Sequence, residues 1–483
     1  MMKKFAIGLL ALSLVFVGVS CTEDQDDNPN NAISINDFIW NGLNVFYLYK
    51  DDVPDLANDR FANELERSAY VNAFESPESL FDNLLYQPGV VDRFSFLVDD
   101  YIELEQLFAG VTKNNGMEYG LVFYPDSEEN IFGYVRYVLP GTDAESKGLT
   151  RGIVFNTVDG VQITNSNFSS LFSGDTYTIG LATYDGTDVT PTGEEITLTK
   201  VEYTENPILV SQTLTVEGQN IGYLMYNGFT ANFDEELNAA FADFVSSGVT
   251  DLVLDLRYNP GGSVFTAVTL SSLITGQFTG EIFTTEQWNS DRQAQFEAND
   301  PDRLVNLFVN EARNGETLNS LGLNRVYVLT TRGSASASEL VINGLDPYVN
   351  VIQIGSTTRG KFTASATLYD SPDYGRSGAN PAHTYAMQPL ILKSVNANGV
   401  TDYFDGLTPE TELSEDYANL GVLGNVNEPL LAEALSQITG AGAPAAPKSF
   451  NLLKEVSSRK EMIPHFDELI YDLPLPDLRA NNQ

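Results

Sequence analysis

Arg325-Val-Tyr-Val-Leu-Thr330, followed by Gly333-Ser-Ala-Ser-Ala-Ser-Glu339, is the stretch that decides the fold. Its first part is an apolar, β-branched run, which is typical of a strand buried on both faces of a sheet. Its second part leads into Leu340-Val-Ile-Asn-Gly344, where a helix is predicted. A strand that turns directly into a helix holds a hydroxyl beyond the sheet, where the first helical N–H groups face incoming negative charge. An ordinary capped helix shows the same pattern, so this stretch alone identifies no nucleophile.

Two further strand ends accompany this stretch at ordinary α/β spacing. Asp251-Leu-Val-Leu-Asp-Leu256 precedes Arg257-Tyr-Asn-Pro-Gly-Gly262, and Val349-Asn-Val-Ile-Gln-Ile354 precedes Gly355-Ser-Thr-Thr-Arg-Gly-Lys361. Apolar strands alternate with helical patterns over residues 205–440, which predicts an α/β layer structure. The pentapeptide of an α/β-hydrolase elbow is absent around these serines, which disfavours that fold.

Taken in order, the three segments resemble the carboxyl-terminal processing (tail-specific) serine proteases and their tricorn-like relatives. The resemblance covers about residues 117–440 and implies an α/β multidomain chain with a crotonase-like ββα spiral core over residues 205–440. The family's nucleophile and base correspond to Ser336 and Lys361, and its oxyanion hole to the backbone N–H groups of Ala337 and Gly262. Many members carry Gln four residues after the lysine. This chain has Ser365 there, which makes it the candidate third member.

A Ser-Lys pair has the chemistry that peptide cleavage needs. A serine hydroxyl is a poor nucleophile until a nearby base takes its proton. A lysine acts as that base when burial lowers its pKa from about 10.4 toward neutrality. The small, acid-free surroundings of the lysine between Gly355 and Ala366 suit such a site.

Other titratable residues near these motifs are expected to be structural. His383 and His465 are the two histidines, and both lie in segments without a nucleophile signature, which disfavours a Ser-His-Asp triad. Arg257 is expected to brace its strand end through an ion pair with Asp255. Glu339 is expected to be a first-turn helix partner and not an acid catalyst.

Residues 113–204 form a different pattern, with short strands separated by turn signals. The order of Pro-Gly, Gly-Leu and Asp-Gly turns after the strand Tyr134-Val-Arg-Tyr-Val-Leu139 resembles a PDZ domain of the bacterial protease type. Gly120, Leu121, Val122 and Phe123 are predicted to begin a strand. By this resemblance they also match the loop whose N–H groups capture a peptide's terminal carboxylate. The peptide then adds as a strand on the sheet edge. A module that only packs or gates the site is the alternative.

The first residues are typical of an export signal, predicted over residues 1–21. Two lysines precede an apolar run from Phe5 to Val19, which is short for a membrane span of about 20 residues. Cys21, the single cysteine, follows directly and resembles the lipidation site of bacterial lipoproteins. An ordinary cleaved signal with an incidental cysteine is the alternative.

The acidic residues after this cysteine resemble the export tag of surface lipoproteins in Bacteroides-like bacteria, and residues 22–33 are predicted to be a tether. We therefore expect attachment to the outer membrane only through a lipid on Cys21, on the periplasmic side or at the cell surface. Residues 34–112 are predicted to be a helical N-terminal domain. Residues 441–483 form a C-terminal tail without an assigned role.

The composition limits the partners. Lys and Arg total 26 against 66 Asp and Glu, a formal net charge of −40 over 483 residues. Such a field repels nucleic acid, which excludes a DNA- or RNA-binding role. The resemblance implies no metal and no cofactor.

The sequence therefore predicts an exported serine endopeptidase that cleaves proteins or peptides with a Ser-Lys dyad, at sites that include those near their C-termini. A non-catalytic peptide- or ligand-binding lipoprotein on the same scaffold is the first alternative. An acyl-CoA enzyme of the crotonase class is the second, and the export signal and PDZ-like module disfavour it.

Overall fold

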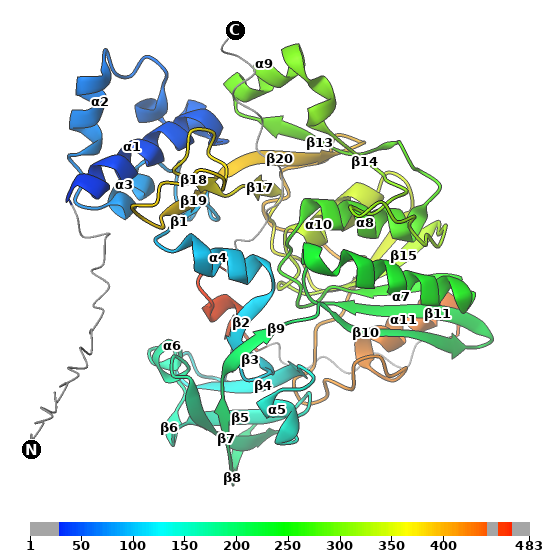
Figure 1. Cartoon of the computed structure of the whole chain (residues 1–483). Helices are drawn as coiled ribbons and strands as arrows, with labels where there is room; N and C mark the ends of the chain where they lie inside the picture. The colour runs from blue at the N-terminus through cyan, green and yellow to red at the C-terminus, as the bar shows by residue number, and fades with distance from the viewer. Residues whose placement is uncertain (1–28, 442–452, 466–483) are drawn as a thin grey trace, which may run out of the picture.

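A computed structural model describes residues 29–441 and 453–465 of the chain (Figure 1). The predicted signal, Cys21 and most of the tether lie outside these residues. Helix α1 (Pro29–Phe46) begins inside the predicted tether, so that prediction is wrong for residues 29–33. The acidic run ends before this point, and proline is well suited to the first position of a helix.

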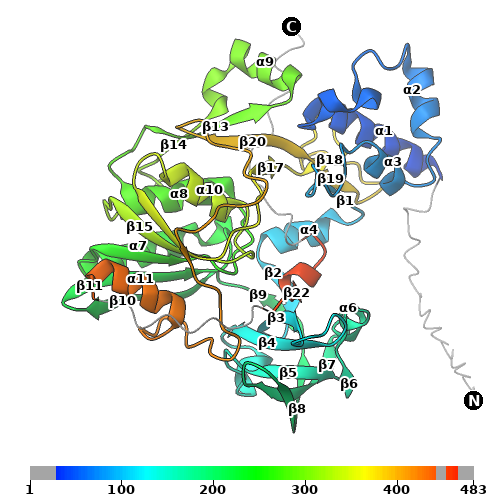
Figure 2. The ribbon, with the colours of Figure 1, turned by 180° about the vertical axis from the view of Figure 1, so that it is seen from behind.

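The N-terminal region is mostly helical, as predicted, and packs its helices against one another (Figures 1 and 2). Its strand β1 (Phe96–Val98) pairs antiparallel with β19 (Ala386–Gln388), which also pairs with β18 (Leu368–Tyr369). The region is therefore joined to the later half of the chain by a sheet. Its other helices are α2 (Glu64–Val71), α3 (Pro77–Asn83), α4 (Tyr101–Phe108) and the 3-10 turns Lys50–Asp52 and Pro54–Leu56.

The next region is a β-sheet with its own apolar core. The strand order is β22-β3-β4-β5-β7-β8, with β6 paired to β5, while β2 pairs with β9. The sheet's first strand, β22 (Glu455–Ser458), comes from the predicted C-terminal tail. The remaining elements are β2 (Val111–Asn114), β3 (Met117–Phe123), β4 (Ile131–Val138), α5 (Asp143–Ser146), β5 (Val154–Val158), β6 (Val161–Gln162), α6 (Phe168–Leu171), β7 (Thr176–Tyr184), β8 (Val189–Thr199) and β9 (Val201–Thr204).

Gly120, Leu121, Val122 and Phe123 lie in a strand, as predicted. They form the second half of β3, and not the loop that the PDZ resemblance implies. The strand is paired with β4 on one side and with β22 on the other. An alternation of large apolar residues around a single glycine fits a strand as well as a loop, and only the paired neighbours decide between them.

The sheet that carries the predicted motifs has the order β10-β11-β12-β15-β16-β21. Strands β11 to β21 are parallel, and β10 is antiparallel at one edge. The predicted strands are confirmed with small shifts in their ends. The bounds are β10 (Ile208–Val216), β11 (Gln219–Tyr226), β12 (Asp251–Asp255), β15 (Arg325–Thr330), β16 (Asn350–Gly355) and β21 (Thr411–Glu412).

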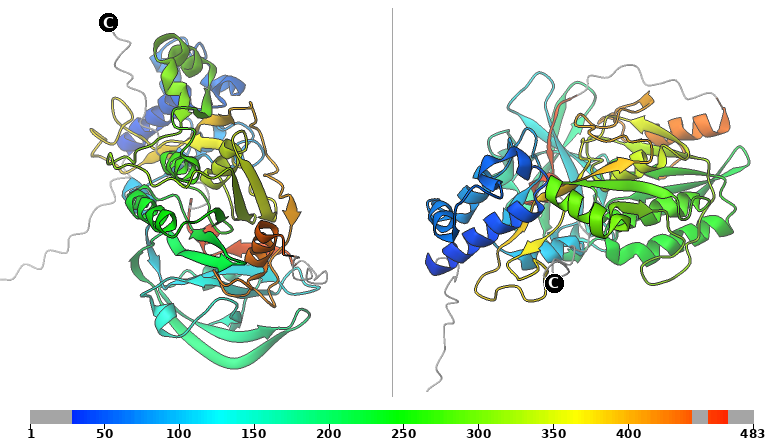
Figure 3. Two further views of the ribbon diagram at one scale, coloured as in Figure 1. Left: turned by 90° about the vertical axis from the view of Figure 1, so that its right-hand side faces the viewer. Right: turned by 90° about the horizontal axis from the view of Figure 1, so that it is seen from above.

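Helices cover both faces of this sheet (Figures 1 and 3). Leu252 and Leu254 pack in the large core that includes α8 and α10, whereas Val253 packs in the core that includes α11. Because successive strand residues face opposite sides, a continuous apolar run is what a doubly covered strand requires. The helices are α7 (Asp234–Ser246), α8 (Val264–Thr275), α10 (Ala337–Leu345) and α11 (Pro429–Thr439).

A second, smaller sheet has the order β14-β13-β20-β17 and completes the mixed α/β, multidomain architecture. It places β17 after the predicted base and β20 beside it. None of the helices within residues 29–441 and 453–465 combines the length and apolar character of a membrane span. The bounds are β13 (Ile282–Trp288), α9 (Ser290–Asn299), the 3-10 turn Pro301–Leu304, β14 (Val305–Leu307), β17 (Thr363–Ser365) and β20 (Leu390–Asn396).

Candidate active site

Three turns meet at the carboxyl edge of the parallel sheet. Asp255 of β12 pairs with Leu329 of β15, and Thr330 of β15 pairs with Gly355 of β16. Because these strands are parallel and in register, the turns that follow them start side by side. The predicted glycine turn, serine run and lysine loop are therefore brought together by the topology.

Asn259 ties the first turn to the serine run. Its side-chain Nδ2 donates to the carbonyl of Tyr226 at 2.8 Å, and its Oδ1 accepts from Gly261 N at 2.9 Å. Its backbone carbonyl accepts from Ala335 N at 3.0 Å and from the hydroxyl of Ser338 at 3.0 Å. One asparagine thus fixes both the turn and the approach to helix α10.

The outer serines of the run are structural. The hydroxyl of Ser334 donates to the carbonyl of Leu256 at 2.8 Å, just as that of Ser338 donates to Asn259. Both side chains are fully buried in these contacts. These two hydroxyls brace the turn, which supports Ser336 as the nucleophile of the run.

Ser336 lies at the start of α10 in an unusual conformation. Its φ is +65° and its ψ is −114°, a region that non-glycine residues rarely occupy. Such a residue carries about 1–3 kcal/mol of local strain, which is typical of functional sites. Ser336 is fully buried, so the packing of the surrounding turn holds its backbone in this strained conformation.

The glycine turn passes directly beside this serine. A Cβ added to Gly261 would lie 2.6 Å from Ser336 Oγ and 3.0 Å from Ala337 N, and the φ of Gly261 is +113°. Only glycine permits this approach. Gly262 follows with a φ of +136°, and a Cβ there would lie 2.4 Å from the carbonyl of Phe229. Gly261 and Ser336 are thus in close contact, and each predicted oxyanion donor directly follows one of them in the chain: Gly262 follows Gly261, and Ala337 follows Ser336.

Glu339 joins the serine run to the lysine loop. Its carboxylate accepts hydrogen bonds from Ser336 N and Lys361 N, both at 2.8 Å, from Gly360 N at 2.7 Å and from the hydroxyl of Thr358 at 2.5 Å. Burial raises the pKa of Glu339, while these hydrogen bonds lower it. The residue is a first-turn partner of α10, as predicted, and it also fixes the backbone of the predicted base.

Lys361 is fully buried, and the N-terminal region covers it. Its Nζ lies 4.8 Å from the centroid of the Phe94 ring, a cation–π geometry when the amine is charged. Beside this ring, Arg93 Nη2 donates to the carbonyl of Gly360 at 2.5 Å. Two residues of the N-terminal region therefore contact the lysine loop directly.

The loop that carries Phe94 is itself well anchored. Asp92 accepts hydrogen bonds from Phe94 N at 3.1 Å, Ser95 N at 2.9 Å and the hydroxyl of Tyr47 at 2.7 Å. No chemistry is predicted for this region from the sequence, and Phe94 is not among the predicted site residues. The one local signal is Asp92, because an Asp side chain often accepts from the backbone N–H two residues on, and this signal indicates the turn and not the contact of Phe94 with Lys361.

Ser365 is buried at the end of β17, where it pairs with Leu390 of β20. The same strand carries Thr363, a second hydroxyl that could accept a hydrogen bond from the lysine. The role of Ser365 as the third member stays a prediction.

Arg257 braces the strand end, as predicted. Its guanidinium is fully buried between Asp255, at 2.8 Å, and Glu428, at 2.7 Å, and it also contacts Glu415 at 3.0 Å. Arg151 pairs with Glu415 at 2.6 Å. Together these groups form a buried ion network around Arg257, four residues before Gly261 in the chain.

His383 is structural. Its Nε2 lies 3.0 Å from Asp370 Oδ2, and its Nδ1 accepts from Tyr385 N at 3.1 Å. Both ring nitrogens are thus used by residues outside the serine run, which fits the expectation that no Ser-His-Asp triad is present. Within residues 29–441 and 453–465, no cluster of three or more His, Cys, Asp or Glu side chains has the geometry of a metal site.

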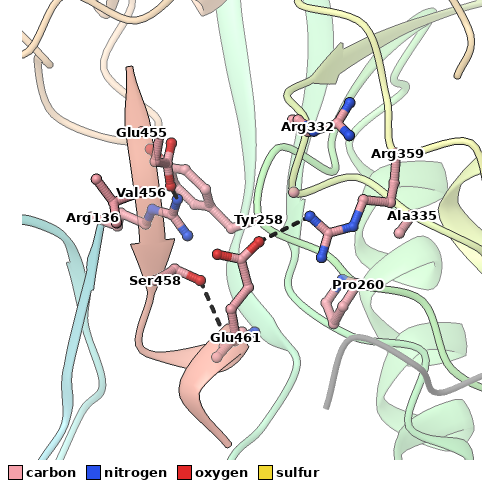
Figure 4. A pocket seen from close by; sticks show the side chains of 12 residues that line it. Arg136, Tyr258, Pro260, Arg332, Ala335, Arg359, Glu455, Val456, Ser458 and Glu461 are labelled. Atoms are coloured by element: carbon pink, nitrogen blue, oxygen red, sulfur yellow. Dashed lines mark hydrogen bonds and ion pairs between the residues drawn. The ribbon is translucent and has the colours of Figure 1, made fainter. Parts of the chain in front are cut away.

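A pocket of about 170 Å³ opens beside the serine run (Figure 4). One wall contains Gly333 together with Pro260 and Ala335, which directly precede Gly261 and Ser336 in the chain. The opposite wall belongs to the C-terminal segment. The full lining is Arg136, Tyr258, Pro260, Arg332, Gly333, Ala335, Arg359, Glu455, Val456, Ser458, Lys460 and Glu461.

Two family models match the chain. Peptidase family S41 matches residues 220–376, and the Peptidase S41 N-terminal domain matches residues 34–96. The first match contains all three turns of the site, including Ser336 and Lys361. The second contains Phe94.

Curated relatives and a solved structure agree with these matches. A carboxyl-terminal-processing protease of Picosynechococcus is 25% identical over 290 residues, which cover 59% of this chain and 62% of the relative. A carboxy-terminal-processing protease of Bartonella bacilliformis is 28% identical over 296 residues, 58% of this chain and 59% of the relative. The chain thus spans about three fifths of these relatives' length. The crystal structure of a putative S41 protease from Bacteroides fragilis, 27% identical, superposes with a TM-score of 0.65 over 83% of this chain and 97% of that one.

Proposed function

The chain belongs to peptidase family S41, a family of serine-type peptidases, and we propose that it cleaves peptide bonds with Ser336 as nucleophile and Lys361 as general base. The observation that carries the proposal is the hydrogen-bonding of Glu339, which accepts from the backbone N–H of both residues at 2.8 Å. The other two serines of the run, Ser334 and Ser338, donate their hydroxyls to backbone carbonyls of the adjacent turn. Ser336, whose N–H donates to Glu339, is therefore the serine of the run that we assign as the nucleophile.

The proposed reaction begins with proton transfer. Burial disfavours a charged ammonium, so the neutral Lys361 amine takes the proton from Ser336 Oγ as that oxygen attacks the substrate carbonyl. The tetrahedral oxyanion is bound by the N–H groups of Ala337 and Gly262. Collapse breaks the C–N bond, the amine product leaves with the proton from Lys361, and water then hydrolyses the acyl-enzyme by the same path.

The finer architecture belongs to the proposal. We assign residues 205–440 as a crotonase-like spiral core, residues 113–204 as a PDZ-like module and residues 34–112 as the N-terminal domain. Peptides would dock along the strand that carries residues 120–123. These residues lie in β3, which becomes the edge of its sheet where β22 is displaced. Processing near the C-terminus of a substrate follows from such docking.

Export and lipid attachment are also proposals. They rest on the signal-like sequence and on Cys21, which places the enzyme at the outer membrane of the cell envelope. Radiolabelled palmitate incorporation that is lost in Cys21→Ser would support the anchor. Equal labelling of both proteins would contradict it.

Two substitutions test the dyad, with casein and tail-tagged peptides as substrates. Ser336→Ala and Lys361→Ala should each lower kcat by at least about 10³-fold, because removing one member of a catalytic unit costs about as much activity as removing all of them. Ser338→Ala is the matched control. It removes one hydroxyl of the same run and should retain most of the cleavage. Cleavage that survives in either dyad variant would contradict the assignment, and a non-catalytic binding protein would show no cleavage in the wild type.

A further inference from the structure

We propose that residues 455–461 are an intramolecular occupant of the groove in which an extended peptide substrate docks, one that carries a carboxylate at each of two positions. The inference rests on the proposed peptidase function and adds the chemical class of peptide that the groove accepts. It combines the pairing of β22, the charges that line the pocket and the position of that pocket beside the serine run.

The segment binds as an added strand. Glu455, Ser457 and Ser458 of β22 pair antiparallel with Val122, Leu121 and Gly120 of β3, respectively. The flanking bonds run from Phe123 N to the carbonyl of Lys454, at 3.1 Å, and from Arg459 N to the carbonyl of Tyr119, at 3.0 Å. A docked peptide adds to a sheet edge by the same pattern of main-chain bonds. The edge that the PDZ-like assignment reserves for a substrate is thus filled by the chain itself.

Charge holds the segment in place. Glu455 pairs with Arg136, which projects from β4, and Glu461 pairs with Arg359 of the lysine loop at 2.9 Å. In Figure 4 the two glutamates project from one segment toward arginines on two different walls of the pocket. Both acids that line the pocket therefore belong to the segment, and each binds a cation of the surrounding fold. The segment's two cations are paired as well, Arg459 with Glu118 and Lys460 with Glu205, so its formal charges cancel.

Without the segment, the groove would be cationic. Arg136, Arg332 and Arg359 would remain on its walls, and no acid among the lining residues would remain with them. This local excess of positive charge lies in a chain whose net charge is −40. Guanidinium groups recognise carboxylates by paired, charge-assisted hydrogen bonds. The peptide that replaces the segment should therefore carry Asp or Glu at the positions of Glu455 and Glu461.

The segment also lies across the way to the catalytic turn. Ala335 and Gly333, which line the pocket opposite the segment, lie one and three residues before Ser336 in the chain. Beyond the pocket the ring of His465 stacks on Phe96, with centroids 4.1 Å apart and planes 11° apart. Residues 455–465, the segment and the four residues after it, therefore span from the docking edge to the N-terminal region that covers Lys361.

A reversible lock tests whether a substrate must displace the segment. Leu121 and Ser457 are directly paired, so their Cβ atoms are close enough for an engineered disulfide with a small adjustment. The double cysteine variant is made in full-length protein with Cys21→Ser, which removes the native cysteine. Ser336→Ala is added for binding measurements, so that the probe is not cleaved.

The probe is a fluorescent synthetic peptide with the sequence of residues 453–465, measured by anisotropy. The reduced protein should bind it at least about tenfold more tightly than the oxidised protein, a change of about 1.4 kcal/mol. The same probe with Gln in place of both glutamates should bind the reduced protein about tenfold more weakly. Equal binding by the locked and unlocked forms, or by the two probes, would overturn the inference.

A second variant weakens the segment without a disulfide. Glu455→Gln with Glu461→Gln, again with Ser336→Ala, should bind the unmodified probe at least about fivefold more tightly than the Ser336→Ala parent. A lower melting temperature without any gain in binding would mean that the segment is a permanent part of the fold, and would overturn the inference. Binding that depends on the lock in a protein without peptidase activity would contradict the proposed function but not this inference.

Discussion

The side-chain carboxylate of Glu339 accepts a hydrogen bond from the backbone N–H of Lys361 at 2.8 Å, although 22 residues separate them. The same oxygen accepts from Ser336 N, the residue at the start of its own helix. The relative position of nucleophile and base is therefore set through one buried side chain. We expect this residue to control the geometry of the reaction without touching substrate.

Glu339→Gln should lower kcat by about 10- to 100-fold with little change in KM. A glutamine has a single acceptor oxygen for four donors, and each buried donor left without a partner costs about 1–3 kcal/mol. The measurement is steady-state kinetics with the melting temperature. Glu286→Gln is the control, because Glu286 is also buried and hydrogen-bonded, to Trp288 and Asn306, but lies in the second sheet. A similar fall in kcat in both variants would assign Glu339 to stability alone.

Phe94 is expected to tune the pH dependence of cleavage through Lys361. Phe94→Leu keeps the site dry but removes the ring face, which stabilises a charged amine by about 2 kcal/mol in a desolvated site. The acid limb of the kcat/KM profile should move to lower pH by about 1.5 units. Phe94→Ala admits water, which favours the charged amine, so its limb should move to higher pH. Two profiles that move together, or not at all, would contradict this role.

Gly261→Ala should abolish cleavage while the protein remains folded. Its methyl group would lie 2.6 Å from Ser336 Oγ, so the serine or the turn must move. A displacement of this size lowers kcat by about 100-fold or more. Gly186→Ala is the matched control, since Gly186 has a similar φ of +98° and no neighbour within 4 Å. Both variants should lose about 1–3 kcal/mol of stability from backbone strain. Activity in Gly261→Ala equal to that of Gly186→Ala would exclude the close approach.

Glu415 should make the fold sensitive to acid. Burial by itself raises the pKa of Glu415, but the opposing effect of Arg151 and Arg257 is larger and lowers this pKa from 4.5 to about 2. A carboxyl with a lowered pKa in the folded state contributes stability above pH 4.5, and this contribution is lost as the pH falls toward 2. The shift corresponds to about 3 kcal/mol. Urea unfolding between pH 2 and 6 should show a steeper loss in the wild type than in Glu415→Gln. Parallel curves would mean that Glu415 does not titrate in this window.

The parts of the fold that could be predicted are those with a local cause. Strands β12, β15 and β16 were predictable because strands covered on both faces need continuous apolar runs. Ser336 could be selected over its neighbours only because three segments occur in a known order. The structure adds an independent reason, since the hydroxyls of Ser334 and Ser338 bind carbonyls of the adjacent turn.

The contacts that could not be predicted join distant segments. Arg93 binds the carbonyl of Gly360 across 267 residues, and no local pattern in the N-terminal helices indicates that contact. The pairing of β22 with β3 is similar, because residues 455–458 have no distinctive strand sequence. Such contacts depend on how the layers stack, which composition and periodicity do not encode.

Strand β22 also affects the order in which the protein is made. Arg459 and Glu118 form a buried ion pair although 341 residues separate them in the chain. During synthesis this ion pair therefore cannot form until Arg459 has been made and has left the ribosome. Until then the edge of β3 is an open template for any extended segment, its own or foreign. Domains fold as units while the ribosome advances at about 5–20 residues per second, which leaves this edge open for tens of seconds. A newly made chain is therefore most exposed to mispairing at the same edge where, in the finished protein, its own C-terminal segment is seated.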